Sequence, residues 1–138
     1  SIQVIPDAHC FEKWANFPRE RQRLFEAIQG ANGGRVILLS GDRHLGEISR
    51  MELPGVAALY EVTASGLNSA GAGKDETNRF RMHADNVRVD HFGLLRAERD
   101  STGLSVLLEL RGVDGAVIQS VEVPAAMAEM GRSNNTNQ

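Results

Sequence analysis

The chain has 138 residues, of which 41% are hydrophobic and 24% charged, the composition of a folded domain rather than of a disordered chain. Its formal net charge of −3 comes without a basic stripe, which argues against nucleic acid as a partner. No apolar run approaches the ~20 residues of a membrane helix, and the single cysteine, Cys10, excludes an internal disulfide.

The N-terminal stretch is expected to be a short strand over residues 2–5, ended by Pro6, which cannot continue a strand ladder. Residues 6–16 then form a loop. This loop carries four side chains of the types that bind metals: Asp7, His9, Cys10 and Glu12. Two interpretations stay open: a surface loop of solvated polar residues anchored by Trp14, or a metal site in which His9 is the first candidate.

Residues 18–29 have the pattern of an amphipathic helix. Pro18 suits the first helical position, and Gly30 or Gly33 is expected to end the helix. Apolar residues recur at spacings of three and four, at Leu24, Phe25 and Ile28. We expect this helix to cover one face of a sheet.

An apolar run over residues 36–39 follows and predicts a central strand buried on both faces, because an exposed strand would alternate. Asp42 and His44 lie just beyond Gly41, two residues apart. If the chain stays extended there, their side chains leave the same face and can converge on one ligand. A carboxylate and an imidazole together suit a divalent or trivalent metal ion, and ligands often bind at the end of a buried strand in α/β folds.

A second strand is expected over residues 56–62, after the turn dipeptide Pro54-Gly55. If it neighbours the first strand, the following loop comes near Asp42 and His44. Ser65 and Asn68 are then candidates to line a substrate pocket. A plain turn of small residues is the alternative.

The rest of the chain divides into a long loop, a meander and a tail. A loop as long as residues 68–86 is usually functional or mobile. Three strand-like segments separated by hairpin turn signals predict an antiparallel meander: residues 87–98, 104–110 and 116–123. His83 and His91, near its start, are expected to be surface or packing residues. Residues 124–138 should form a short helical turn and a disordered tail.

Three motifs occur in an order typical of one enzyme family. The central one is Ser40-Gly41-Asp42-Arg43-His44, followed by Gly46-Glu47-Ile48-Ser49. Upstream lie Trp14-Ala15-Asn16-Phe17-Pro18 and Glu20-Arg21-Gln22-Arg23-Leu24, and downstream lies Tyr60-Glu61-Val62-Thr63-Ala64-Ser65-Gly66-Leu67-Asn68. Together they resemble the PhoD-like (alkaline phosphatase D) branch of the calcineurin-like metallophosphoesterases, in which the last metal-binding motif reads Gly-Asp-x-His. Asn78-Arg79-Phe80 matches a further family segment, expected to pack the long loop against the sheet.

The resemblance implies an α/β fold over residues 1–123: the C-terminal half of a metallophosphoesterase-type β-sandwich, flanked by helices and ending in an antiparallel β-meander. It implies that Asp42 and His44 are metal-site residues, with His9, Ser65 and Asn68 as further candidates for metal or substrate. The metal ions would be iron, calcium, manganese or zinc. The substrate would be a phosphate ester, either a monoester or a diester.

The superfamily builds its site from three earlier motifs, Asp-x-His, Gly-Asp-x-x-Asp and Gly-Asn-His-Asp/Glu, and we expect none of them in these 138 residues. The resemblance therefore implies part of a longer enzyme, with the missing N-terminal half as its partner and an inactive chain by itself. A periplasmic or extracellular location follows if that half carries a signal peptide. The alternative is a non-enzymatic β-rich binding module, in which Asp42 binds its own loop backbone and His44 is a packed imidazole.

Overall fold

A computed structural model describes residues 2–31, 36–56, 58–71, 76–101 and 103–124. Our expectation for residues 125–138, a helical turn and a tail, lies outside the described residues. The helices are η1 (Trp14–Asn16) and α1 (Pro18–Gly30), and the strands are β1 (Ile37–Ser40), β2 (Gly46–Met51), β3 (Leu59–Ala64), β4 (His91–Asp100), β5 (Gly103–Gly112) and β6 (Val117–Val123). The fold is thus mixed α/β, with one α-helix and two three-stranded sheets in the described part.

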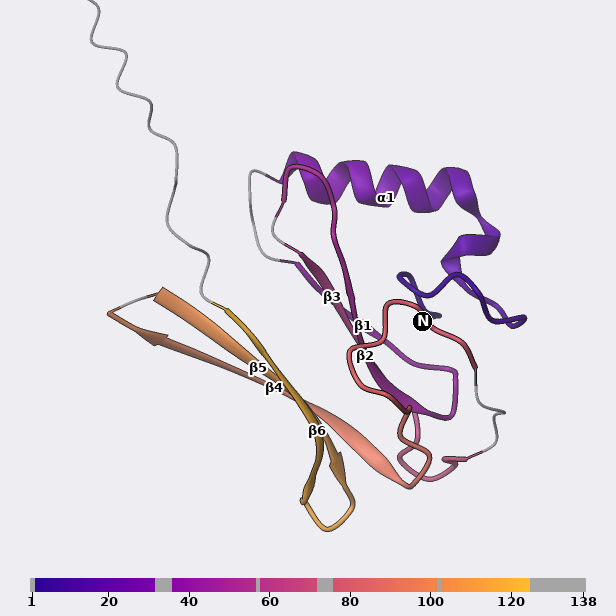
Figure 1. Cartoon of the computed structure of the whole chain (residues 1–138), viewed down its shortest axis with the longest axis vertical. Helices are drawn as coiled ribbons and strands as arrows, with labels where there is room; N and C mark the ends of the chain where they lie inside the picture. The colour runs from indigo at the N-terminus through magenta and orange to yellow at the C-terminus, as the bar shows by residue number, and fades with distance from the viewer. Residues whose placement is uncertain (1, 32–35, 57, 72–75, 102, 125–138) are drawn as a thin grey trace, which may run out of the picture.

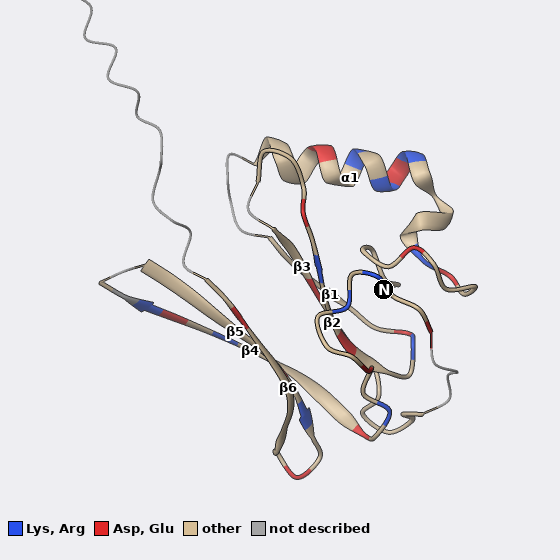
Figure 2. Cartoon of the chain, in the orientation of Figure 1, with Lys and Arg blue, Asp and Glu red and all other residues tan. Residues whose placement is uncertain are grey.

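Helix α1 forms where the sequence predicts it. Pro18 occupies the start of the helix, where its missing N–H costs nothing. Phe25 and Ile28 are buried on one side, and they belong to a hydrophobic core with Leu59 of β3. Basic and acidic residues alternate along the rest of the helix (Figure 2). The amphipathic pattern therefore placed the helix on the sheet correctly.

The sheet that contains β1 has the order β1-β3-β2, so β1 is an edge strand. Our prediction of a central strand is wrong, because β3 takes that position, parallel to β1 and antiparallel to β2. Ile37 and Leu38 pack against the cores on opposite faces, but Leu39 is 65% exposed. No residue of β1 is fully buried, so our prediction of a strand buried on both faces is wrong as well. At the edge of a sheet, an apolar run can remain partly exposed.

Two elements at this sheet differ from expectation. Residues 2–5 do not form a strand, although residues 3–5 are buried, because a glutamate side chain rather than a neighbouring strand accepts the N–H groups of Val4 and Ile5. Strand β2 was not anticipated. Its alternating polar residues, Glu47 and Ser49, are buried, and so is Ile48 between them, so both faces of the first part of β2 are covered.

The second sheet is the predicted meander, with the order β4-β5-β6 and antiparallel pairing throughout. Strand β5 buries Val106, Leu108 and Leu110 on one of its faces, and Glu109 on the other face is buried too. The three apolar side chains pack against Ile48 and Val62 of the first sheet. The two sheets therefore enclose a common core.

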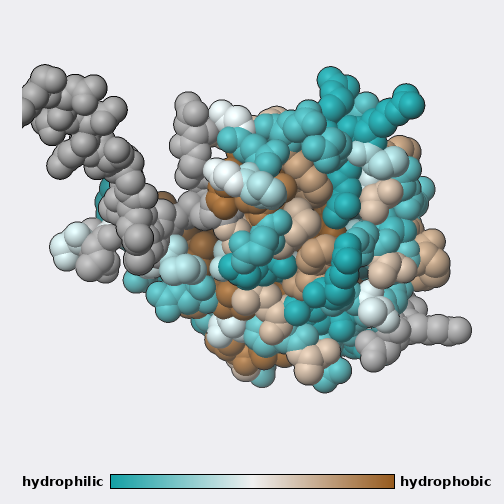
Figure 3. Space-filling view, turned by 45° about the horizontal axis from the view of Figure 1, so that its top comes forward, coloured by the Kyte–Doolittle hydropathy of each residue, from teal (hydrophilic) through white to brown (hydrophobic). Residues whose placement is uncertain are grey.

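The molecule has three layers: α1, the β1-β3-β2 sheet and the β4-β5-β6 sheet (Figure 1). Hydrophilic side chains dominate the side on which α1 lies, with hydrophobic patches between them (Figure 3). In the part of the chain that the structure describes, there is no helix able to cross a membrane.

Candidate functional site

The turn between β1 and β2 holds Asp42 and His44 in a rare backbone conformation. Their φ angles are 69° and 53°, in the left-handed region that few non-glycine residues adopt. Both residues are exposed. Our expectation of an extended chain is therefore wrong here. Each such residue costs about 1–3 kcal/mol and persists only where its surroundings hold it, which makes the turn a candidate functional element.

Arg43 anchors the middle of this turn. Its side chain is buried, pairs with the carboxylate of Glu76 and lies over the ring of Phe11, with 4.2 Å between the guanidinium carbon and the ring centroid. Its backbone N–H donates to Ser65 Oγ at 3.0 Å. The turn is thus held both by the side chain of Arg43 and by its backbone N–H.

The loop after β3 lies beside the turn, as the parallel pairing of β1 with β3 requires. Ser65 Oγ also donates to the carbonyl of Leu45 at 3.2 Å, so Ser65 joins the two loops. Ser65 was a substrate-pocket candidate, but its hydroxyl is engaged by backbone groups. Asn68, the other candidate, is exposed in the same loop.

Two further contacts orient His44. Its Nδ1 lies 3.2 Å from Ser69 Oγ, and its carbonyl accepts a hydrogen bond of 3.2 Å from Gly71 N–H. The contact with Ser69 occupies Nδ1 and leaves Nε2 as the nitrogen available to a ligand. A metal-binding histidine commonly has its other ring nitrogen bonded in this way.

His9 is buried rather than solvated. Neither ring nitrogen has a hydrogen-bond partner, and the ring lies 6.4 Å from that of Phe11. Burial lowers the pKa of His9, the charge of Arg43 lowers it further, and Glu76 opposes both effects. His9 is thus a neutral imidazole near the residues that anchor the turn. It does not join Asp42 and His44 in a three-ligand group within the described residues.

Asp7-Ala8-His9 has the spacing Asp-x-His, so our expectation that this motif is absent is wrong. In the structure, however, Asp7 pairs with Arg79, with 2.5 Å between Oδ2 and Nη2, while His9 lies near Arg43. Asp7 is thus engaged in an ion pair, whereas the ring nitrogens of His9 have no hydrogen-bond partner. The structure therefore gives this pair no shared role.

A buried polar network covers the end of the sheet next to the turn. Glu47 accepts hydrogen bonds from Gln3 Nε2 at 2.7 Å, Asn78 Nδ2 at 3.0 Å and Arg81 Nε at 2.7 Å. Phe80 packs against the core under α1, so the expectation that residues 78–80 pack the long loop against the sheet is confirmed. The network fixes that loop to β2.

Glu61 of β3 is the second buried carboxylate of this network. It accepts hydrogen bonds from Val4 N–H at 2.9 Å and Ile5 N–H at 2.7 Å. Desolvation raises the pKa of Glu61, and the hydrogen bonds from Ile5 and Val4 oppose this rise. The residue therefore holds the N-terminal segment on the sheet.

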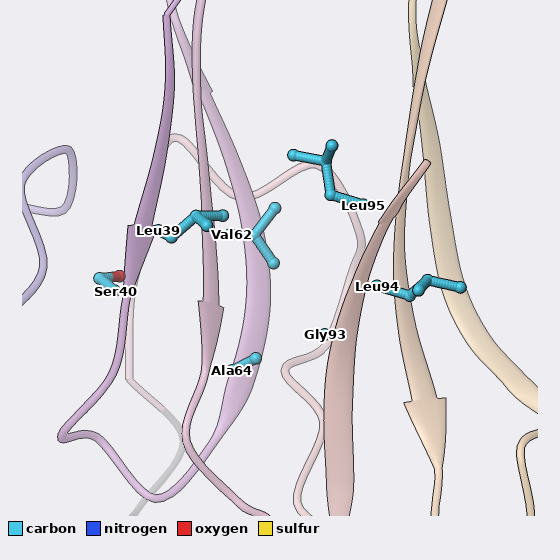
Figure 4. A pocket seen from close by; sticks show the side chains of 7 residues that line it. All are labelled: Leu39, Ser40, Val62, Ala64, Gly93, Leu94 and Leu95. Atoms are coloured by element: carbon cyan, nitrogen blue, oxygen red, sulfur yellow. The ribbon is translucent and has the colours of Figure 1, made fainter. Parts of the chain in front are cut away.

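An apolar groove of about 260 Å³ lies between the open edges of β1 and β4. It is lined by Leu39, Ser40, Val62, Ala64, Gly93, Leu94 and Leu95. Leu39 and Val62 point from the first sheet toward β4 (Figure 4). The lining contains neither Asp42 nor His44 and no charged side chain, so the groove is separate from the candidate site.

Asp42 and His44 supply a carboxylate and an imidazole, which are ligand types for metal ions; both residues are exposed, and the imidazole is oriented by Ser69. No group of three or more His, Cys, Asp or Glu that could hold a metal ion occurs among the described residues. The donor set is therefore suitable in type but supplies only part of a coordination sphere.

Comparisons with protein-family models, with curated proteins and with solved structures found no match to this chain.

The sequence did not point to Ser69, nor to Phe11 and Glu76 as the residues that hold Arg43. Ser69 has no motif around it, and Glu76 lies 33 residues from Arg43 along the chain. The exposed metal candidates could be named from residue types. Their supports could not be, because those contacts form only in the folded chain.

Proposed function

We propose that this chain is the C-terminal portion of a PhoD-like metal-dependent phosphoesterase, and that Asp42 and His44 bind metal ions there. The observation that supports this most directly is the turn itself. Two non-glycine residues with positive φ flank a buried arginine at the end of β1, and both expose a ligand-type side chain. A costly backbone that presents two such side chains is typical of a functional site.

The chain's own residues prepare these side chains. Arg43 and Ser65 fix the turn, and Ser69 orients the His44 ring. When bound, a pair of metal ions supplies a hydroxide nucleophile at neutral pH and neutralises the phosphoryl oxygens of a phosphate ester. The other ligands would come from polypeptide outside these 138 residues. The two sheets with a common core form the corresponding part of a metallophosphoesterase-type β-sandwich in this proposal.

The test uses the full-length protein, with metal content measured by mass spectrometry and hydrolysis of a chromogenic phosphodiester measured in parallel. Asp42→Ala and His44→Ala should each lower activity by at least about 100-fold and reduce bound metal, because a first ligand is lost. His83→Ala, in a half-buried histidine that belongs neither to the turn nor to the loop after β3, is the matched control and should keep most activity. A wild-type rate in His44→Ala would exclude the proposed function.

A further inference from the structure

We propose that His91 is a positioning residue that holds the Asp42–His44 turn and the loop after β3 in their relative places. For its consequence on metal binding, this inference rests on the proposed function. His91 begins β4 in the other sheet, so the sequence gives no reason to connect it with the turn. Its side chain is fully buried, with 0% exposure, so it is not available to bind a ligand itself.

The imidazole of His91 lies in a cradle made by two glycines. A Cβ atom built on Gly46 would lie 2.6 Å from His91 Nε2, and one built on Gly66 would lie 2.3 Å from His91 Cε1. Real Cβ atoms do not approach other atoms so closely. The ring therefore leaves no room for a Cβ atom at either position, and at Gly66 the Cβ of Ala70, 2.9 Å away, adds to this. The turn conformation does not require glycine, since neither glycine has a positive φ.

Hydrogen bonds fix the ring within this cradle. His91 Nδ1 lies 2.8 Å from the carbonyl of Val89, which can only accept, so Nδ1 carries the hydrogen. Nε2 has no hydrogen-bond partner and faces the backbone of Gly46. The backbone N–H of His91 donates to the carbonyl of Gly66 at 3.0 Å. One residue thus fixes the start of β2 and the loop after β3 to β4.

These two glycines are next to the candidate site. Gly46 directly follows the turn that carries Asp42 and His44, and Gly66 directly follows Ser65, which binds Arg43 N–H. The loop after Gly66 then supplies the contacts of Ser69 and Gly71 with His44. Removing the ring would leave a cavity between the two loops, so their relative position would no longer be determined by packing.

The first test measures hydrogen exchange in the full-length protein at two amides. Arg43 N–H binds Ser65 Oγ and Gly71 N–H binds the His44 carbonyl, so both report on the junction of the loops. His91→Ala should speed exchange at both amides by about tenfold. The matched control is Leu108→Ala, which removes a fully buried side chain from the core between the sheets and should leave these two amides within about threefold of wild type.

A second variant keeps the test decisive if His91→Ala does not fold. Gly46→Ala leaves His91 in place but pushes against its ring, and it should speed exchange at the same two amides. Where His91→Ala folds, adding Gly46→Ala should speed exchange much less than it does in the wild-type background, because the ring that the new Cβ atom would meet is gone. If the effects of the two substitutions on exchange are additive, the ring does not lie against Gly46 and the proposal is wrong. Unchanged exchange in Gly46→Ala would also contradict it.

The metal readout separates this inference from the proposed function. If the full-length protein binds Mn²⁺, His91→Ala should weaken that binding by about tenfold or more, whereas Leu108→Ala should not. If both variants lose the same Mn²⁺ affinity, the loss comes from lower overall stability, and His91 has no positioning role. If the wild-type protein binds no metal, the proposed function fails, while the exchange rates still decide whether His91 positions the two loops.

Discussion

The carboxylate of Glu61 accepts a hydrogen bond of 2.7 Å from the backbone N–H of Ile5, 56 residues away along the chain. It also accepts the N–H of Val4, so a side chain in the central strand replaces the strand ladder that the N-terminal segment lacks. Buried backbone N–H groups need partners. Glu61 therefore allows this buried segment to lie on the sheet without a neighbouring strand.

Glu61→Gln should lower the free energy of unfolding by about 1–3 kcal/mol. The amide keeps one acceptor oxygen, which in the place of Oε2 still accepts from Ile5 N–H and, at 3.2 Å, from Val4 N–H. The 2.9 Å bond from Val4 N–H to Oε1 is lost, because an NH₂ group then faces that donor. Chemical denaturation measures the change. Glu52→Gln, in an exposed pair with Arg50, is the control and should change stability by less than about 0.5 kcal/mol. Equal effects of the two substitutions would contradict the role of Glu61.

The pH dependence of the same pair of proteins gives a second prediction. Because burial raises the pKa of Glu61, the folded state binds its proton more readily than the unfolded state does. The contribution of Glu61 to stability is therefore highest below its ordinary pKa and falls as pH rises toward the raised pKa. The stability of wild type relative to Glu61→Gln should decrease across that interval. An increase with pH would contradict the raised pKa.

The contribution of His9 to stability changes with pH in the opposite direction. Burial lowers the pKa of His9, so the unfolded state takes up the proton first as pH falls. Its contribution is fully present above the ordinary pKa of histidine and is lost as pH falls toward the lowered pKa. Denaturation of His9→Gln and wild type between pH 5 and 8, the range in which histidine ordinarily titrates, should show wild type losing stability relative to the variant on the acid side. Parallel curves would show that His9 is not a buried neutral imidazole.

The left-handed turn predicts an unusual order of stability. His44→Gly should be more stable than His44→Ala by about 1 kcal/mol, because a positive φ strains any residue with a Cβ atom. Glu26, exposed in α1, is the control, and there glycine should be less stable than alanine by a similar amount. Thermal or chemical unfolding compares the four variants. Alanine as the more stable residue at position 44 would exclude the strained turn.

Arg43 should matter for stability far more than a surface arginine. Arg43→Met would leave the carboxylate of Glu76 buried without its partner and should cost about 3 kcal/mol. Adding Glu76→Gln should restore part of this loss. Arg23→Met, in an exposed pair with Glu20, is the matched control and should cost less than about 1 kcal/mol. Similar losses at the two arginines would argue against a buried anchor.

The chain by itself should bind metal weakly and hydrolyse no phosphate ester. Asp42 and His44 are two ligands, and a stable site for these metals needs more. Calorimetric titration with Mn²⁺, Fe²⁺, Zn²⁺ and Ca²⁺, together with a phosphodiester assay, checks this. Tight stoichiometric binding with turnover would show a self-sufficient site in these 138 residues and would contradict the proposed division of the ligands.

The sequence by itself determined the elements whose signals are local. Helix α1 follows from Pro18 and an apolar period of three to four residues, and the meander follows from alternating strands between hairpin turns. The same local reading placed Asp42 and His44 just after a strand. Each of these features depends on residues within a few positions of one another, so no distant partner was needed to predict them.

Only the tertiary structure decided the features that depend on distant partners. It placed β1 at an edge, buried the polar face of β2, and replaced a strand at residues 2–5 with a segment held by Glu61. Likewise, the ring of His91 explains two glycines 45 and 25 positions before it. Which strand lies at an edge, and which group bonds a buried polar atom, depend on contacts between segments far apart in the sequence. A local sequence pattern does not contain this information.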